Sequence, residues 1–142
     1  METIPINYLA VLVAAVANMI LGSLWFGPIF GKMWIKASGK TPEECEVGKH
    51  KNMGGSYALM FLGSLVMAYV LAHALVFGNA YLGTSGISAG LVVGFWNWLG
   101  FVAPVTIGVV LWDGKPWKYW AITYLYNLVG FLLMGAILAW WV

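Results

Sequence analysis

The sequence predicts an all-α polytopic membrane protein, a bundle of four transmembrane helices with a short interfacial or cytoplasmic helical segment between the first two. Composition is the first reason: hydrophobic residues make up 62% of the 142 residues and charged residues only 8%. An ordinary soluble domain has roughly 25% charged residues, so the surface of this one must face lipid. The second reason is four long apolar stretches, and the third is that all lysines flank the same ends of these stretches. We expect one transmembrane domain over residues 1–142.

Each apolar stretch is long enough to cross a membrane. The expected spans are about 7–26, 56–77, 85–111 and 117–142, and their only charged side chain is Lys118, at the start of the last. A helix rises about 1.5 Å per residue and the hydrocarbon core is about 30 Å thick, so 20 residues suffice. Backbone groups in lipid must pair within their own segment, which favours helices. Glu2 and the absence of lysine before the first stretch indicate a retained span rather than a signal peptide.

The lysines predict the orientation. Five lie between the first and second spans and two lie at the turn between the third and fourth, whereas the N-terminus, residues 78–84 and the C-terminus contain none. Loops rich in lysine stay in the cytoplasm. We therefore expect a multi-pass protein of the cytoplasmic (inner) membrane with both termini on the outer, periplasmic side.

The connections carry structure of their own. Between residues 29 and 40 an apolar helical face opposes a face with three lysines, a pattern that suits a short helix in the headgroup layer. Thr41, Pro42 and Glu44 form a capping-box signature, so a second short helix should begin there and end near Gly48. Asp113-Gly114 predicts a tight turn between the third and fourth spans.

Several sequence segments resemble a bacterial family of small four-span membrane proteins, catalogued as domain of unknown function 1761. They are Tyr8–Ala14, Gly31–Trp34, Ser64–Ala72, Gly100–Pro104 and Pro116–Lys118, and they occur in the family's order over nearly the whole chain. The resemblance implies the four-span fold. It implies no reaction, ligand or site residue.

Polar residues inside spans are the candidates for function, because each must find a partner or line a cavity. Asn18, Asn97 and Asn127 all fall near the midpoints of their spans, so we identify them as a candidate polar midplane cluster. Asn97 should face the interior and lie near Asn18 or Asn127. The cluster could bond helices together, or it could bind a neutral solute.

Small residues on the third span form a candidate helix-packing face, composed of Gly86, Gly90 and Gly94. Small residues let helix backbones approach closely in membranes. We therefore expect the third span to be the most buried of the four. Trp96 and Trp98 flank Asn97 at mid-span, where they either pack between helices or wall a pocket.

His73 is a candidate polar group of the outer leaflet. It either donates a hydrogen bond to a neighbouring helix or acts as a pH-sensitive group. His50 lies beside two lysines with no third metal ligand evident, and the single cysteine, Cys45, lies between Glu44 and Glu46, whose charges disfavour a thiolate, so no metal site and no cofactor is predicted. A net charge of +2 and the absence of arginine argue against nucleic-acid binding.

No catalytic constellation is visible, so we expect a non-enzymatic structural or regulatory membrane component that self-associates. Its partners would be the lipid bilayer, further copies of itself in a homo-oligomer, or another membrane protein. The alternative is a small transporter or channel for a neutral solute that uses the midplane cluster. All acidic residues lie outside the spans, which argues against proton-coupled export of the usual kind.

Overall fold

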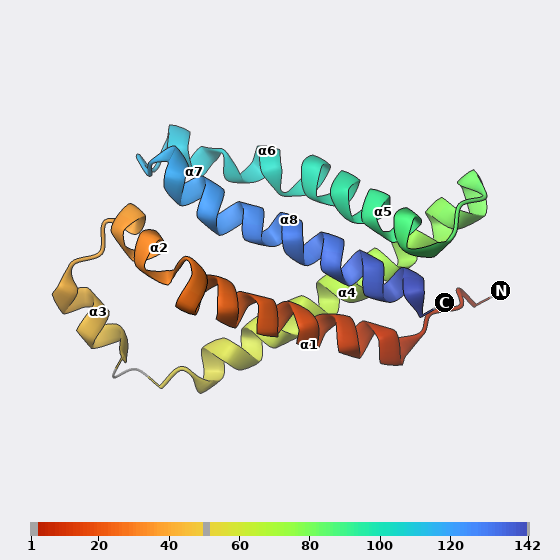
Figure 1. The fold of residues 1–142 in the computed structure, drawn as a ribbon, viewed down its shortest axis with the longest axis horizontal. Coiled ribbons are helices and arrows are strands. Elements are labelled where there is room, and N and C mark those ends of the chain that lie inside the picture. Colours follow the sequence, from red (N-terminus) through yellow and green to blue (C-terminus); the bar gives the residue numbers. More distant parts are fainter. Residues whose placement is uncertain (1–2, 50–51, 142) are drawn as a thin grey trace.

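The computed structural model describes residues 3–49 and 52–141 (Figure 1). In chain order its helices are α1 (Tyr8–Leu24), the π-helical segment η1 (Trp25–Ile29), α2 (Gly31–Ser38), α3 (Pro42–Lys49), α4 (Gly54–Leu82), α5 (Gly86–Phe101), α6 (Ala103–Thr106), α7 (Gly108–Leu111) and α8 (Trp117–Trp140). The described residues contain no β-strand.

Four helical units are long and apolar enough to cross a membrane: Tyr8–Ile29, Gly54–Leu82, Gly86–Leu111 and Trp117–Trp140. The predicted all-α, four-span fold is therefore confirmed. The second unit is longer than expected, because α4 continues through the polar residue Asn79 and ends only at Gly83. There a left-handed backbone (φ 64°) stops the helix, and glycine adopts that conformation without steric cost.

The first span does not continue straight into the loop. Gly27 has non-helical angles (φ −101°, ψ −105°) and Pro28 lacks an N–H, so the regular hydrogen-bond pattern of α1 cannot persist. The chain closes a wider turn instead, in which Phe30 N donates to Trp25 O at 2.8 Å. A Cβ at Gly31 would lie 2.6 Å from Phe26 O, so the bend needs glycine there. This kink directs α2 onto α8.

The third span is interrupted and sits at the edge of the bundle. The helix breaks between Phe101 and Ala103, next to Pro104, and continues as α6 and α7. In the apolar part of this span only 11% of the residues are buried, whereas 28% to 33% are buried in the corresponding parts of the other three spans. The expectation that this is the most buried helix is wrong, because close packing of one glycine face leaves the rest of α5 exposed.

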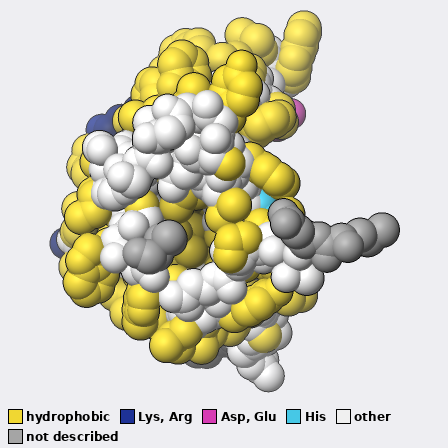
Figure 2. All heavy atoms as spheres, turned by 90° about the vertical axis from the view of Figure 1, so that its right-hand side faces the viewer, with side chains coloured by type: hydrophobic (Ala, Val, Ile, Leu, Met, Phe, Trp, Pro, Cys, Tyr) yellow, Lys and Arg dark blue, Asp and Glu magenta, His cyan; other side chains and the backbone are white. Residues whose placement is uncertain are grey.

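The spans form two hairpins that pack together. In Figure 1, α8 lies between α1 and α5, and α4 crosses behind them. We call the end with residues 30–49, 52–53 and 112–116 the lysine end, and the end with residues 3–7, 83–85 and 141 the terminal end. Figure 2 looks onto the terminal end and shows hydrophobic side chains around most of its rim, as a lipid-facing surface requires.

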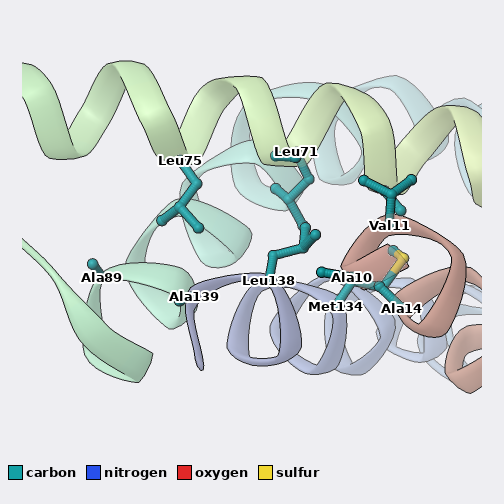
Figure 3. Close-up of a cluster of buried hydrophobic side chains, with 11 residues drawn as sticks. Ala10, Val11, Ala14, Leu71, Leu75, Ala89, Met134, Leu138 and Ala139 are labelled. Atoms are coloured by element: carbon teal, nitrogen blue, oxygen red, sulfur yellow. The ribbon is translucent and has the colours of Figure 1, made fainter. Parts of the chain in front are cut away.

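The apolar core occupies the terminal half of the bundle (Figure 3). Leu71 and Met134 are each 1% exposed, and small residues such as Ala14 and Ala68 let the helices approach around them. Asn7 connects the start of α1 to the end of α8. Its Oδ1 caps α1 by accepting from Ala10 N at 3.1 Å, and its Nδ2 donates to Trp141 O at 3.2 Å.

The capping box at the start of α3 is present. Thr41 N donates to Glu44 Oε2 at 2.8 Å, and Glu44 N donates to Thr41 Oγ1 at 3.2 Å. The helix runs through Gly48 to Lys49 rather than ending at Gly48. A hydrogen bond from Lys49 to Glu46 at 2.8 Å raises the pKa of the exposed Lys49 ammonium and supports this last turn.

Candidate functional site

A buried cluster of three polar side chains lies where α1, α4 and α8 meet. Asn18 Nδ2 donates to Ser64 Oγ at 3.0 Å, and Tyr126 OH donates to Asn18 O at 3.3 Å with Asn18 Oδ1 at 3.5 Å. Ser64 is 1% exposed, Asn18 3% and Tyr126 7%. We call these residues the polar triad. It joins three helices from different parts of the chain through one residue, Asn18, by its side-chain amide and its backbone oxygen.

Two glycines make room for the triad. A Cβ at Gly130 would lie 2.5 Å from Asn18 Oδ1, and a Cβ at Gly22 would lie 2.9 Å from Tyr126 OH. Helix α8 can therefore approach the Asn18 amide, while the Tyr126 ring lies along α1. The sequence analysis placed Asn18 at the midplane but missed Ser64 and Tyr126. Ser64 could have been found by its depth, since it too falls near the middle of its span.

The other two midplane asparagines have different partners. Asn97 Nδ2 donates to Val93 O at 2.8 Å, and Asn127 Nδ2 donates to Thr123 O at 3.3 Å. Both acceptors are carbonyls of the same helix, four residues earlier. Among the described residues no hydrogen bond joins Asn97 or Asn127 to Asn18. The three asparagines thus do not form one hydrogen-bonded cluster: Asn18 bonds to α4, whereas Asn97 and Asn127 bond within their own helices.

Two of the three candidate packing glycines on α5 are in contact with α8. A Cβ at Gly90 would lie 2.6 Å from Gly135 C and 2.7 Å from the Ala139 Cβ. A Cβ at Gly94 would lie 2.5 Å from Phe131 O. Gly86 is not part of this packing: a Cβ there has nothing within 4 Å, and its φ of 76° shows that it serves the turn before α5.

Indole N–H groups bind the lysine half of the bundle to α8. Trp25 Nε1 donates to Ile122 O at 2.8 Å, and Trp98 Nε1 donates to Tyr124 O at 2.9 Å. Trp34 Nε1 and Trp120 Nε1 donate to threonine hydroxyls, those of Thr123 and Thr106 respectively. Trp98 therefore packs between helices, at 7% exposure, whereas its near neighbour Trp96 is 62% exposed.

The loops at the lysine end are joined by a contact that the sequence analysis did not identify. Lys115 Nζ donates to Ser38 O at 2.7 Å, which ties the α7–α8 turn to the last residue of α2. The same ammonium lies 5.6 Å from the centre of the Tyr119 ring. One of the seven lysines thus satisfies a helix-terminal carbonyl, in addition to any role in orientation.

Two lateral cavities adjoin the polar residues but do not meet. One, of about 330 Å³, lies between α1 and α4 and reaches the Tyr126 side chain; Gly22, Phe26, Tyr57 and Met60 are among its other lining residues. The second, of about 360 Å³, lies between α4 and α5 and is lined by Asn97 and six apolar side chains. No residue lines both cavities. They do not form a path through the protein that includes all three asparagines.

His73 bonds within its own helix rather than to a neighbouring one. Its Nδ1 lies 2.8 Å from Tyr69 O, and its ring packs edge-on against the Tyr69 ring at 4.4 Å. Tyr8 of α1 stacks on Tyr69 at 6.5 Å. Within residues 3–49 and 52–141, no three His, Cys, Asp or Glu side chains come together as a metal site would require. His50 lies outside the described residues.

The comparison with known families agrees with this architecture. The family model described as protein of unknown function (DUF1761) matches residues 9–139, which include all or nearly all of each of the four spans. No curated protein and no solved structure matches the chain. Because the match covers far more than half of its length, the chain belongs to the DUF1761 family, which is described as proteins of unknown function.

Proposed function

We propose that this chain is a non-enzymatic structural or regulatory component of the cytoplasmic membrane, that it self-associates, and that both termini lie on the outer side. The observation that carries the proposal is the closed polar triad. Asn18 is 3% exposed; its amide donates to Ser64, and its backbone oxygen accepts from Tyr126 OH. One residue is thus used to hold three helices together. A solute site would instead leave the Asn18 amide and the Ser64 hydroxyl open to a cavity, and neither residue lines the two lateral cavities.

The chemistry of the buried groups supports a non-enzymatic role. Ser64 is the buried hydroxyl of the triad, but its recorded partner is an amide, which cannot act as a base. His73 is occupied by the carbonyl of Tyr69. The carboxylates of Glu43, Glu44 and Glu46 lie on α3, outside the four spans. No described nucleophile is therefore paired with a general base.

Two features support self-association. Helix α5 packs one face closely and leaves the remainder exposed, including Trp96 at mid-span. The next residue, Asn97, donates one amide N–H to a carbonyl of its own helix. Polar groups that face acyl chains are costly, so a protein neighbour in the membrane would lower the cost of exposing the Trp96 indole N–H and the rest of the Asn97 amide.

Reconstitution tests the two parts of the proposal together. In vesicles of bacterial polar lipid, single-molecule photobleaching should count more than one copy per assembly at low protein-to-lipid ratio. Uptake of glycerol or urea, followed by light scattering after an osmotic step, should match that of empty vesicles. Faster uptake that is lost on Tyr126→Phe would contradict the proposal and favour a solute path through the α1–α4 cavity, the second candidate.

Orientation has its own test. An impermeant thiol reagent applied to intact cells should label Asn79→Cys in a Cys45→Ser background, since residue 79 lies at the terminal end. In the parent protein, which keeps Cys45, the reagent should leave this cysteine unlabelled until the cells are opened. Labelling of Cys45 in intact cells would place the lysine end outside.

A further inference from the structure

The groove between α4 and α5 leaves polar groups without partners at mid-span. The two helices meet at the turn formed by residues 83–85 and diverge toward the lysine end (Figure 1). Near the turn α4 still contacts α5, since a Cβ at Gly78 would lie 3.5 Å from Val93 Cγ2. One turn further along α5, the helices have separated and enclose a groove of about 360 Å³.

Asn97 lines this groove on the α5 side, and the exposed Trp96 precedes it in the chain. Successive residues of a helix are rotated by about 100° around its axis, so Trp96 and Asn97 project on either side of Val93, and Val93 points toward α4. Asn97 lines the groove together with Val66 and Val70 of α4. Trp96 is 62% exposed, and Val66 and Val70 are 54% and 55% exposed. The groove is thus an open apolar surface with an amide at its wall and an exposed indole on the preceding residue.

The unmet groups are complementary. The recorded bond from Asn97 Nδ2 to Val93 O leaves the amide oxygen free of any donor in the described part of the chain. Trp96 Nε1 likewise donates to no group among residues 3–49 and 52–141, whereas four other tryptophans do donate. Acyl chains satisfy neither group. One position therefore offers a donor and the next an acceptor.

Symmetry determines which neighbour can satisfy both. Copies inserted in the same orientation are related by an axis along the membrane normal, so each residue meets partner residues at its own depth. Trp96 and Asn97 differ in depth by only about 1.5 Å. In a two-fold pair, each indole N–H can reach the partner's amide oxygen, and the contact is made twice.

We propose that the α4–α5 groove is the interface between two parallel copies of this chain, with the Trp96 indole of each copy donating to the Asn97 amide of the other. The inference rests on the self-association proposed above and assigns it to one surface. The apolar walls of the groove accommodate the partner's aromatic side chain, and the paired hydrogen bonds fix the register.

The test uses the full chain in lipid nanodiscs or vesicles and measures the dimer dissociation constant by subunit photobleaching at graded protein-to-lipid ratios. Trp96→Phe keeps the aromatic ring and removes only the N–H, and Asn97→Leu removes the amide. Each should raise the dissociation constant about tenfold, since two hydrogen bonds are lost per dimer. The double variant should be no weaker than either single variant. Trp140→Phe, the same change at a tryptophan 72% exposed at the terminal end, should have no effect.

Three results would overturn the inference in distinguishable ways. Dimers that are unaffected by Trp96→Phe and Asn97→Leu would place the interface elsewhere, while self-association would stand. Monomers at every protein-to-lipid ratio would contradict both proposals. A monomer that carries a lipid in native mass spectrometry, and loses it on Asn97→Leu, would assign the groove to a lipid.

Discussion

The contact between α5 and α8 gives the sharpest prediction about stability. The perturbation is Gly90→Ala, which adds a single methyl group. A Cβ at this position would lie 2.6 Å from Gly135 C and 2.7 Å from the Ala139 Cβ, whereas ordinary contact begins at 3.4 Å. The Gly135 carbonyl oxygen would lie closer still, so the helices would have to separate by at least about 0.8 Å, and the nearest obstacle is backbone rather than a flexible side chain.

The expected cost follows from this overlap. Overpacking of a close contact costs about 1–3 kcal/mol, and separating α5 from α8 also weakens the Trp98 hydrogen bond to Tyr124 O. The matched control is Gly100→Ala, on the same helix, where a Cβ has nothing within 4 Å. There the change should be neutral or stabilising by up to about 1 kcal/mol, as expected for Gly→Ala in an open helix.

Unfolding by SDS titration from mixed micelles, followed by tryptophan fluorescence, measures both variants. We expect the Gly90→Ala midpoint to fall well below that of the parent protein, and the Gly100→Ala midpoint to equal or exceed it. Equal midpoints for the two variants would refute the close approach of α5 and α8.

Three further predictions concern contacts between distant parts of the chain. Asn18→Leu should lower the free energy of unfolding by about 1–2 kcal/mol in the same titration, because it removes the bond to Ser64 and the 3.5 Å contact of Asn18 Oδ1 with Tyr126 OH; an unchanged midpoint would contradict the triad. Trp98→Phe removes one indole donor and part of a buried ring, so it should cost at least about 1 kcal/mol, and an unchanged midpoint would contradict the bond to Tyr124 O. Lys115→Met should speed hydrogen exchange in α2, whose last carbonyl it binds, and equal exchange in both proteins would show that the contact does not hold α2.

The fold was predictable because the cost of placing polar groups in hydrocarbon determines it almost alone. Four apolar stretches of sufficient length must become helices. The capping box at Thr41 and Glu44 was predictable for a local reason, since both partners lie within one helical turn. Hydropathy was less informative about breaks. The third apolar stretch runs through Pro104, and the first, expected at about 7–26, ends before Gly27-Pro28, so neither interruption of the helix was predicted.

The candidate site was only partly predictable, because sequence gives the depth of a residue better than its direction. Asn18, Asn97 and Asn127 were predicted to share a depth, but their partners depend on how the helices are rotated and which helices are adjacent. The glycines of α5 illustrate the same limit. Gly90 and Gly94 indicated close packing, but not that α8 of the same chain would be the neighbour. The bond from Lys115 to Ser38 joins loops 77 residues apart and has no local signal.

The claim that the central polar groups are closed off inside the bundle is tested most directly by the water accessibility of position 64. In a Cys45→Ser background, Ser64→Cys should be inert toward a small, charged, water-soluble thiol reagent added from both sides of the membrane, and should react only after unfolding. Gly83→Cys, in the turn at the terminal end, provides the reactive reference. Reaction of Ser64→Cys in the folded protein at a rate near that of the reference would contradict the account, because it would show that water reaches the triad.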